Sequence, residues 1–195
     1  MRPRYIPATF ALAVTTFSGA IGYRALEATP VQTGASKDPA VIARGAYLVG
    51  SMGCHDCHTP WKMGPKGPEP DMTRALTGHP QDIKVPPAPK LPEGWAWAGS
   101  PTNTAFAGPW GISFTANLTP DPETGLGKWT EEMFITALRT GRHEGKGRPI
   151  LPPMPWPMIR NLTDADLRGI FAYLQSLPPV NNRVPQPVDP PETGR

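Results

Sequence analysis

The sequence predicts a fold built from helices, with little strand and much irregular chain. Of its 195 residues, 28 are proline and 20 are glycine, a combined share at the edge of low-complexity composition. Proline breaks helix interiors and sheet ladders, so we expect most of the prolines outside regular structure. Six Trp and six Phe supply the apolar bulk of a packed core. Three segments with helix-boundary residues predict three helices.

The first two predicted helices are marked at their ends. One begins near Asp38, a good N-cap residue, with Pro39 at the first helical position, where its missing N–H costs nothing, and runs to about Met52. The other lies between Thr130, which can cap it, and Gly141, which can stop it. Acidic residues in its first turn and an arginine in its last turn complement the helix dipole.

The third predicted helix has the clearest pattern. Thr163 is its cap, and Pro178 with Pro179 ends it. Its apolar residues recur at helical spacing and share one face: Leu167, Ile170, Phe171, Leu174 and Leu177. We expect this face to pack in the core.

Between these helices, the domain at 38–179 contains one long proline-rich loop, 59–128, with no helical or strand periodicity. A structureless segment of this length is usually functional or partly disordered. A proline-rich tail, 180–195, follows the domain and is expected to be extended.

The N-terminal segment, 1–24, has the features of an export signal peptide. Arg2 and Arg4 make its start positive, and residues 5–23 carry no charge. A retained single-helix membrane anchor and a buried helix of a soluble domain remain alternatives. Residues 25–37 are then expected to form a tether. The net charge of +3 is too small to indicate nucleic-acid binding.

The motif that decides the chemistry is Cys54-His55-Asp56-Cys57-His58. Two thiols separated by two residues can each add across a vinyl group of haem, and the histidine that follows can bind the iron as its proximal ligand. A structural zinc site needs four ligands, and the sequence offers only the two cysteines and one or two nearby histidines. A thioredoxin-like redox pair needs a βαβ setting, which the sequence does not predict. A plain disulfide leaves His58 unexplained. The sequence therefore predicts covalently bound haem c and, from the single motif, one haem.

The second axial ligand is predicted to be Met154. This residue stands in the sequence Leu-Pro-Pro-Met-Pro-Trp, just before the third predicted helix. Proline fixes φ, so such a loop can hold a thioether in place at little cost in conformational entropy. Met158 and a site that is open or has another ligand remain alternatives. Met133, on a helix face, is expected in the core.

Several other side chains invite a functional interpretation. Two tryptophans are equally compatible with a place at the haem, by lining its pocket or binding a propionate, and with an ordinary core: Trp110 and Trp129. Two arginines are expected to be solvated surface charges rather than propionate partners: Arg139 and Arg142. Three histidines are expected not to bind iron: His55, His79 and His143.

With these residues assembled, the chain resembles the class I c-type cytochromes, and in particular the cytochrome c subunits of membrane-bound bacterial dehydrogenases. The resemblance covers 39–179 in segments. It rests on Arg-Gly-Ala-Tyr-Leu at 44–48, Asn-Leu-Thr-Pro-Asp at 117–121, Thr-Gly-Leu-Gly-Lys-Trp at 124–129 and Met-Pro-Trp at 154–156.

This resemblance implies an all-α fold in which the first and last helices cross beside a buried haem, with His58 and Met154 as the iron ligands. The dehydrogenase subunits usually carry three haem motifs, whereas this sequence has one, which favours a single-haem carrier or a small accessory subunit. Thioether ligation raises the reduction potential of the iron.

The function predicted is electron transfer, with no catalytic residues, by a periplasmic protein that is soluble or tethered to the inner membrane through its N-terminus. Its partners are expected to be redox proteins or a membrane-bound redox complex. Two alternatives stay open. One is a permanently bound subunit of a dehydrogenase, oxidase or photosynthetic complex, and the other is a haem-based ligand sensor, which needs an open sixth position.

Overall fold

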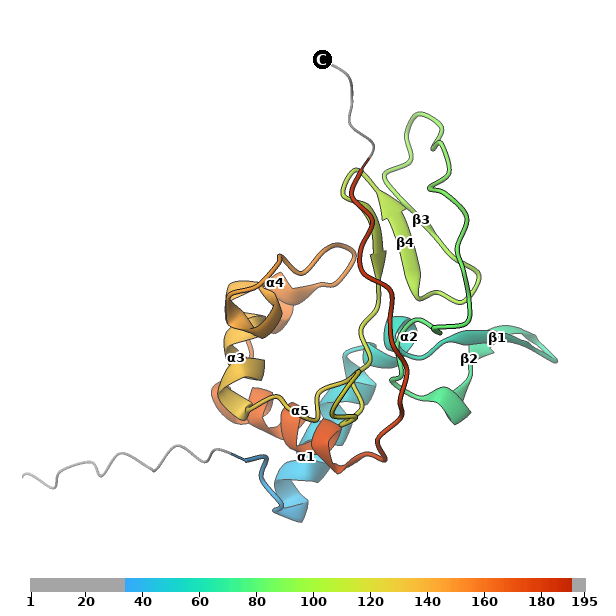
Figure 1. Ribbon diagram of the computed structural model, residues 1–195. Helices are drawn as coiled ribbons and strands as arrows, with labels where there is room; N and C mark the ends of the chain where they lie inside the picture. The colour runs from blue at the N-terminus through green and yellow to red at the C-terminus, as the bar shows by residue number, and fades with distance from the viewer. Residues whose placement is uncertain (1–33, 191–195) are drawn as a thin grey trace, which may run out of the picture. The chain divides into compact units, whose positions relative to one another are not determined.

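The computed structural model describes residues 34–190 (Figure 1). The predicted signal peptide or anchor at 1–24, most of the tether and the last five residues of the tail lie outside the described residues. Among the described residues, no helix is both long enough and apolar enough to cross a membrane.

All three predicted helices are confirmed, together with their caps. Asp38 accepts a hydrogen bond from Ala40 N–H at the start of the first helix, and Thr130 and Thr163 accept from the backbone three residues on in the other two. The structure adds two short helices, so the set is α1 (Pro39–Ser51), α2 (Cys54–His58), α3 (Glu131–Thr140), α4 (Trp156–Ile159) and α5 (Asp164–Ser176), with 3₁₀ turns η1 (Met72–Arg74) and η2 (His143–Gly145).

Helices α1 and α5 cross at two glycines. A Cβ atom on Gly45 would lie 1.8 Å from the carbonyl oxygen of Gly169, so no larger residue fits between the two backbones. Next to this crossing, Arg44 Nε lies 2.9 Å from Asp166 Oδ1. The helix crossing that the resemblance implied is therefore present, and the two glycines allow the backbones of α1 and α5 to come into contact.

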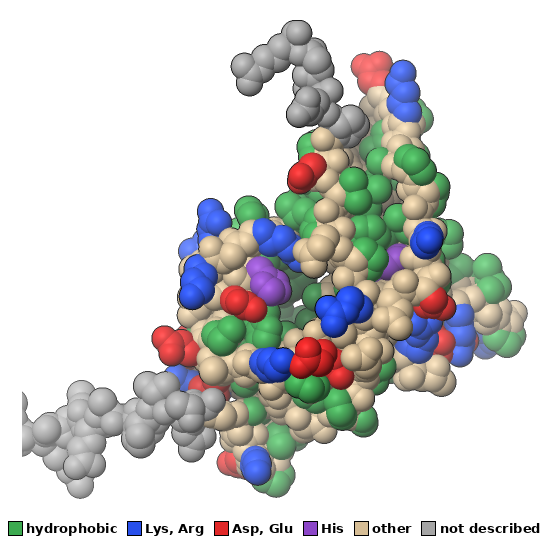
Figure 2. All heavy atoms as spheres, in the orientation of Figure 1, with side chains coloured by type: hydrophobic (Ala, Val, Ile, Leu, Met, Phe, Trp, Pro, Cys, Tyr) green, Lys and Arg blue, Asp and Glu red, His purple; other side chains and the backbone are tan. Residues whose placement is uncertain are grey.

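A hollow opens in one face of the molecule, between the helices α3 and α4 on one side and the strands on the other (Figure 2). Hydrophobic side chains line its floor. Such a concave, apolar surface is the usual form of a cofactor site.

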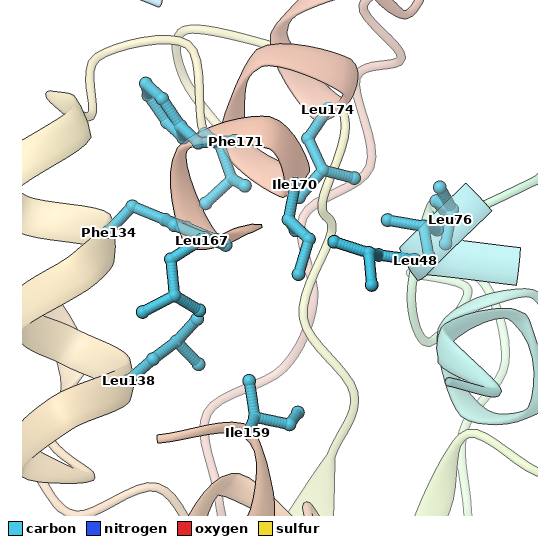
Figure 3. Packing of buried hydrophobic residues seen from close by; sticks show 11 residues of the cluster. Leu48, Leu76, Phe134, Leu138, Ile159, Leu167, Ile170, Phe171 and Leu174 are labelled. Atoms are coloured by element: carbon cyan, nitrogen blue, oxygen red, sulfur yellow. The ribbon is translucent and has the colours of Figure 1, made fainter. Parts of the chain in front are cut away.

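The core packs α5 against α1 and α3. Phe134 of α3 and Phe171 of α5 stack with ring centroids 5.3 Å apart. Figure 3 shows Leu48, Leu138, Ile159 and Ile170 pointing toward a common space between their helices. The buried cluster consists of Leu48, Val49, Leu76, Leu126, Phe134, Leu138, Ile159, Leu167, Ile170, Phe171 and Leu174.

The all-α fold is not confirmed, because the described residues also form two small antiparallel sheets. Both sheets lie in the segment predicted as a loop at 59–128, and their strands are β1 (Trp61–Gly64), β2 (Gly67–Pro70), β3 (Ala98–Gly99), β4 (Ala105–Gly108) and β5 (Gly111–Phe114). Strands of two to four residues are too short to show the alternation on which sequence-based assignment depends. Glycine and proline at their ends hide them further.

The described part of the tail, 180–190, is extended and bonded to the rest of the chain. Val188 pairs with Ile112 of β5 through two backbone hydrogen bonds, of 2.8 and 2.9 Å. Asn182, which is buried, donates to the carbonyl oxygens of Thr77 and His79 at 2.7 and 2.9 Å. The tail therefore runs beside the sheet β3–β4–β5 as part of the domain (Figure 1).

Candidate functional site

The cysteine-histidine motif forms the short helix α2, directly after α1. Gly53, between the two helices, has φ of 71°, in the left-handed region that favours glycine. This conformation ends α1 and lets α2 begin within two residues. The sequence predicted the motif but not this turn.

His58 is buried, and its ring orientation is set by the backbone. Its Nδ1 lies 2.8 Å from the carbonyl oxygen of Ala116. A carbonyl only accepts, so Nδ1 carries the proton and Nε2 keeps its lone pair for a metal. Burial lowers the pKa of His58, which favours the neutral imidazole that binds metals.

Both cysteine side chains of the motif are half-buried free thiols in the described structure. Burial raises the pKa of Cys54 to about 11 and raises the pKa of Cys57 as well. A thioredoxin-like redox cysteine has instead a lowered pKa. The electrostatics thus disfavour the redox-pair alternative.

The structure separates the two candidate methionines. Met154 is half-buried and packs against the same hydrophobic cluster as Cys54. Met158 lies on α4 with 72% of its surface exposed. Met133 is half-buried on α3. Of the two candidates, Met154 is therefore the one whose side chain faces the hydrophobic cluster.

The residues present fit a haem. The donor set of two thiols, one imidazole with an unshared nitrogen and one thioether matches haem c chemistry. Leu48, Leu138, Ile159 and Ile170 point into a common apolar space (Figure 3).

Two polar atoms also fit a group that carries carboxylates. Within residues 34–190, Trp110 Nε1 and Thr115 Oγ1 are buried without a hydrogen-bond partner. A buried donor without a partner is costly and calls for an explanation, and the propionates of a haem are acceptors for such donors. Trp110 thus has an unpartnered donor that a propionate could accept from, while Trp129 packs against the hydrophobic cluster.

The other three histidines have different surroundings. His79 is fully buried and uses both ring nitrogens within the protein: Nε2 donates to the carbonyl oxygen of Ile83 at 3.0 Å, and Nδ1 accepts from the Thr104 hydroxyl at 2.9 Å. His143 is exposed, and His55 is half-buried on α2. His79 therefore has no free ring nitrogen to offer to a metal.

The two arginines make hydrogen bonds and an ion pair at the surface of the protein. Arg139 pairs with Asp164 of α5 at 2.6 Å and also donates to the carbonyl oxygen of Arg160. Arg142 donates to the carbonyl oxygen of Gly147 at 3.0 Å. Arg139 therefore links α3 to the start of α5, a role that the sequence did not indicate.

One functional group was missed by reasoning from the sequence, namely the carbonyl oxygen of Ala116. Every residue has such a group, so no side-chain signal distinguishes it. Its position after β5 depends on tertiary structure.

Comparison with known proteins finds similarity to cytochromes. The family model for cytochrome c matches residues 42–178. The cytochrome c subunit of alcohol dehydrogenase (quinone) from Gluconobacter oxydans is 32% identical over 136 residues, which cover 70% of this chain and 21% of that protein. The fructose dehydrogenase cytochrome subunit of Gluconobacter japonicus is 27% identical over 173 residues, covering 89% of this chain and 29% of that protein.

A shorter match has higher identity. A subunit of nicotinate dehydrogenase from Pseudomonas putida is 42% identical over 77 residues, which cover 40% of this chain and 6% of that protein. The chain thus spans less than a third of the length of each of these three relatives.

Proposed function

The chain belongs to the cytochrome c family, and we propose that within this family it is a carrier of a single haem c. Membership implies covalently bound haem and electron transfer. Cys54 and Cys57 would hold the haem, and His58 and Met154 would be the iron ligands. The single motif in the sequence supports one haem.

The observation that carries the proposal is the hydrogen bond between His58 and Ala116. This bond leaves Nε2 unprotonated and keeps the ring in one orientation, an arrangement that is usual for histidines that bind metals. The half-buried thiols of Cys54 and Cys57 are on the same short helix. Attachment and ligation are thus supported by one rigid element.

Met154 completes the proposed site. His58 and Met154 would hold the haem so that no position stays open for a substrate, and the group would supply only exchange between Fe(III) and Fe(II). The apolar side chains around the site would limit water at a bound haem and so would favour the less charged, reduced iron. These features support an electron carrier over a ligand sensor.

For partners we propose a dehydrogenase or another redox protein on the periplasmic side of the inner membrane. The relatives are named as cytochrome subunits of dehydrogenases, which favours a subunit or a closely associated carrier. The described part of the tail is bonded to this chain's own sheet, which favours a self-contained carrier over one whose tail wraps a neighbour.

The test is the absorption spectrum and mass of the purified protein and two methionine variants. The intact protein should exceed its polypeptide mass by one haem. Met154→Ala should lose the thioether-to-iron band and gain carbon monoxide binding when reduced, whereas Met158→Ala, the matched control on exposed α4, should keep the band. A band that persists in Met154→Ala, or carbon monoxide binding by the unmodified protein, contradicts the ligand assignment.

A further inference from the structure

Strand β5 and the residue pair that follows it are bonded to one proposed iron ligand and to the loop that carries the other. Ala116, two residues past the strand, accepts the hydrogen bond from His58. Within the strand, Ser113 Oγ donates to the carbonyl oxygen of Pro152 at 2.6 Å, and Pro152 is two residues before Met154. One stretch of four residues thus contacts the proximal ligand and the loop of the distal one.

The loop that carries Met154 has little else to hold it. Proline has no N–H, so three of the four residues at 152–155 cannot donate a backbone hydrogen bond. Within residues 34–190, the bond from Ser113 is the one hydrogen bond that residues 151–154 make. Removing it leaves packing alone to position the thioether.

Ser113 itself is well placed to act as a support. The residue is buried, with 7% of its surface exposed, so little water can compete for the hydroxyl. The carbonyl oxygen of Phe106 is also near but at 3.4 Å, so the shorter bond to Pro152 takes the proton. The neighbouring Ile112 is paired to Val188 of the tail, which holds the strand from its other edge.

We infer that Ser113 is a positioning residue for Met154. Its hydrogen bond holds the Met154 loop, residues 151–154, in the position at which the thioether can bind the iron. This inference rests on the proposed function, because it assumes that Met154 is the ligand. On this inference, the sheet β3–β4–β5 and the tail hold Ser113 in place, and Ser113 in turn holds the Met154 loop.

The test is displacement of the methionine by added imidazole, monitored by the loss of the thioether-to-iron band in the oxidised holoprotein. Ser113→Ala should bind imidazole about ten-fold more tightly, the change expected when one buried hydrogen bond to the loop is lost. Ser113→Thr keeps a hydroxyl on the strand and should restore weaker imidazole binding.

The control is Ser100→Ala, beside the same sheet. Ser100 Oγ accepts from the Ala105 N–H at 3.1 Å and makes no bond to the Met154 loop. This variant should weaken the sheet in a denaturation experiment but leave imidazole affinity unchanged, which separates positioning of the loop from general stability.

The two ideas fail in different ways. Unchanged imidazole affinity in Ser113→Ala, or an equal increase in Ser100→Ala, overturns the role of Ser113 while Met154→Ala still lacks the band. A band that survives in Met154→Ala overturns the proposed ligand instead. If Ser113→Ala does not fold, Ser113→Cys decides, because its thiol fills the same space and is only a weak donor: tighter imidazole binding than in the unmodified protein supports the role of the hydroxyl, and an equal affinity contradicts the inference.

Discussion

The helical frame (α1, α3 and α5) and the sheet region (β3, β4 and β5 with tail residues 180–190) are held together in different ways. Each helix of the frame has a side-chain cap within three residues of its start. The tail is joined to the rest of the sheet region by pairs far apart in sequence, such as Ile112 with Val188. Local bonds therefore define where each frame helix starts, whereas distant partners define where the tail lies.

This difference matters for the site because the two regions contribute different kinds of groups to it. The thiols and imidazole lie directly after the first helix of the frame, on α2. The bonds that orient His58 and the Met154 loop come from β5 and the residue pair after it. The frame provides apolar side chains beside the site, and β5 with the residues after it provides the polar contacts to His58 and the Met154 loop.

The largest effect is expected at the helix crossing. Gly45→Ala should lower the free energy of unfolding by about 4 kcal/mol, because the new Cβ would lie 1.8 Å from the Gly169 carbonyl oxygen and must push the helices apart. Gly50→Ala on the same helix is the matched control. It meets nothing within 4 Å and should raise stability by about 0.5 kcal/mol. Chemical denaturation followed by circular dichroism measures both, and equal effects would refute the close crossing.

A smaller loss is expected in the sheet region from Phe106→Ala. Phe106 is 2% exposed, so its truncation should cost about 3 kcal/mol. Because β5 is bonded to the Met154 loop and the tail, we expect one cooperative transition by tryptophan fluorescence and circular dichroism. Met63→Ala, at a side chain 78% exposed, should change stability by less than about 0.5 kcal/mol. Two separate transitions would mean that the two regions unfold independently.

Asn182→Ala should cost about 2 kcal/mol, measured by the same denaturation. The change leaves the buried carbonyl oxygens of Thr77 and His79 without their donors. Asn181→Ala is the control, since Asn181 is exposed and makes one long contact, of 3.4 Å, with Asp121. A loss as small as that of the control would show that the tail does not support the domain.

The smallest effect is expected at a cap of the frame. Thr163→Ala should cost about 1 kcal/mol, because the Asp166 N–H at the start of α5 loses its acceptor. Thr163→Asn supplies another capping oxygen and should stay near the wild-type stability. No difference between the two variants in thermal denaturation would show that local capping contributes little to the frame.

The sequence predicted the parts of the molecule whose signals are local. The caps at Asp38, Thr130 and Thr163 and the apolar face of the last helix are confirmed. The five strands were not predicted, since strands of two to four residues are too short to show alternation of apolar and polar residues. For the site, the positions of Cys54, Cys57 and His58 come from one motif, and Met154 stays a prediction that its burial supports.

By itself, the sequence determined the cytochrome c character of this protein and its helical frame, because a motif and a helix cap are complete within a few residues. Only the tertiary structure decided which backbone carbonyl orients His58, which hydroxyl reaches the Met154 loop and where the tail lies. These contacts join residues tens of positions apart, between His58 and Ala116 or Ser113 and Pro152. A hydrogen bond requires only a donor near an acceptor, so the residue types alone do not specify the pair.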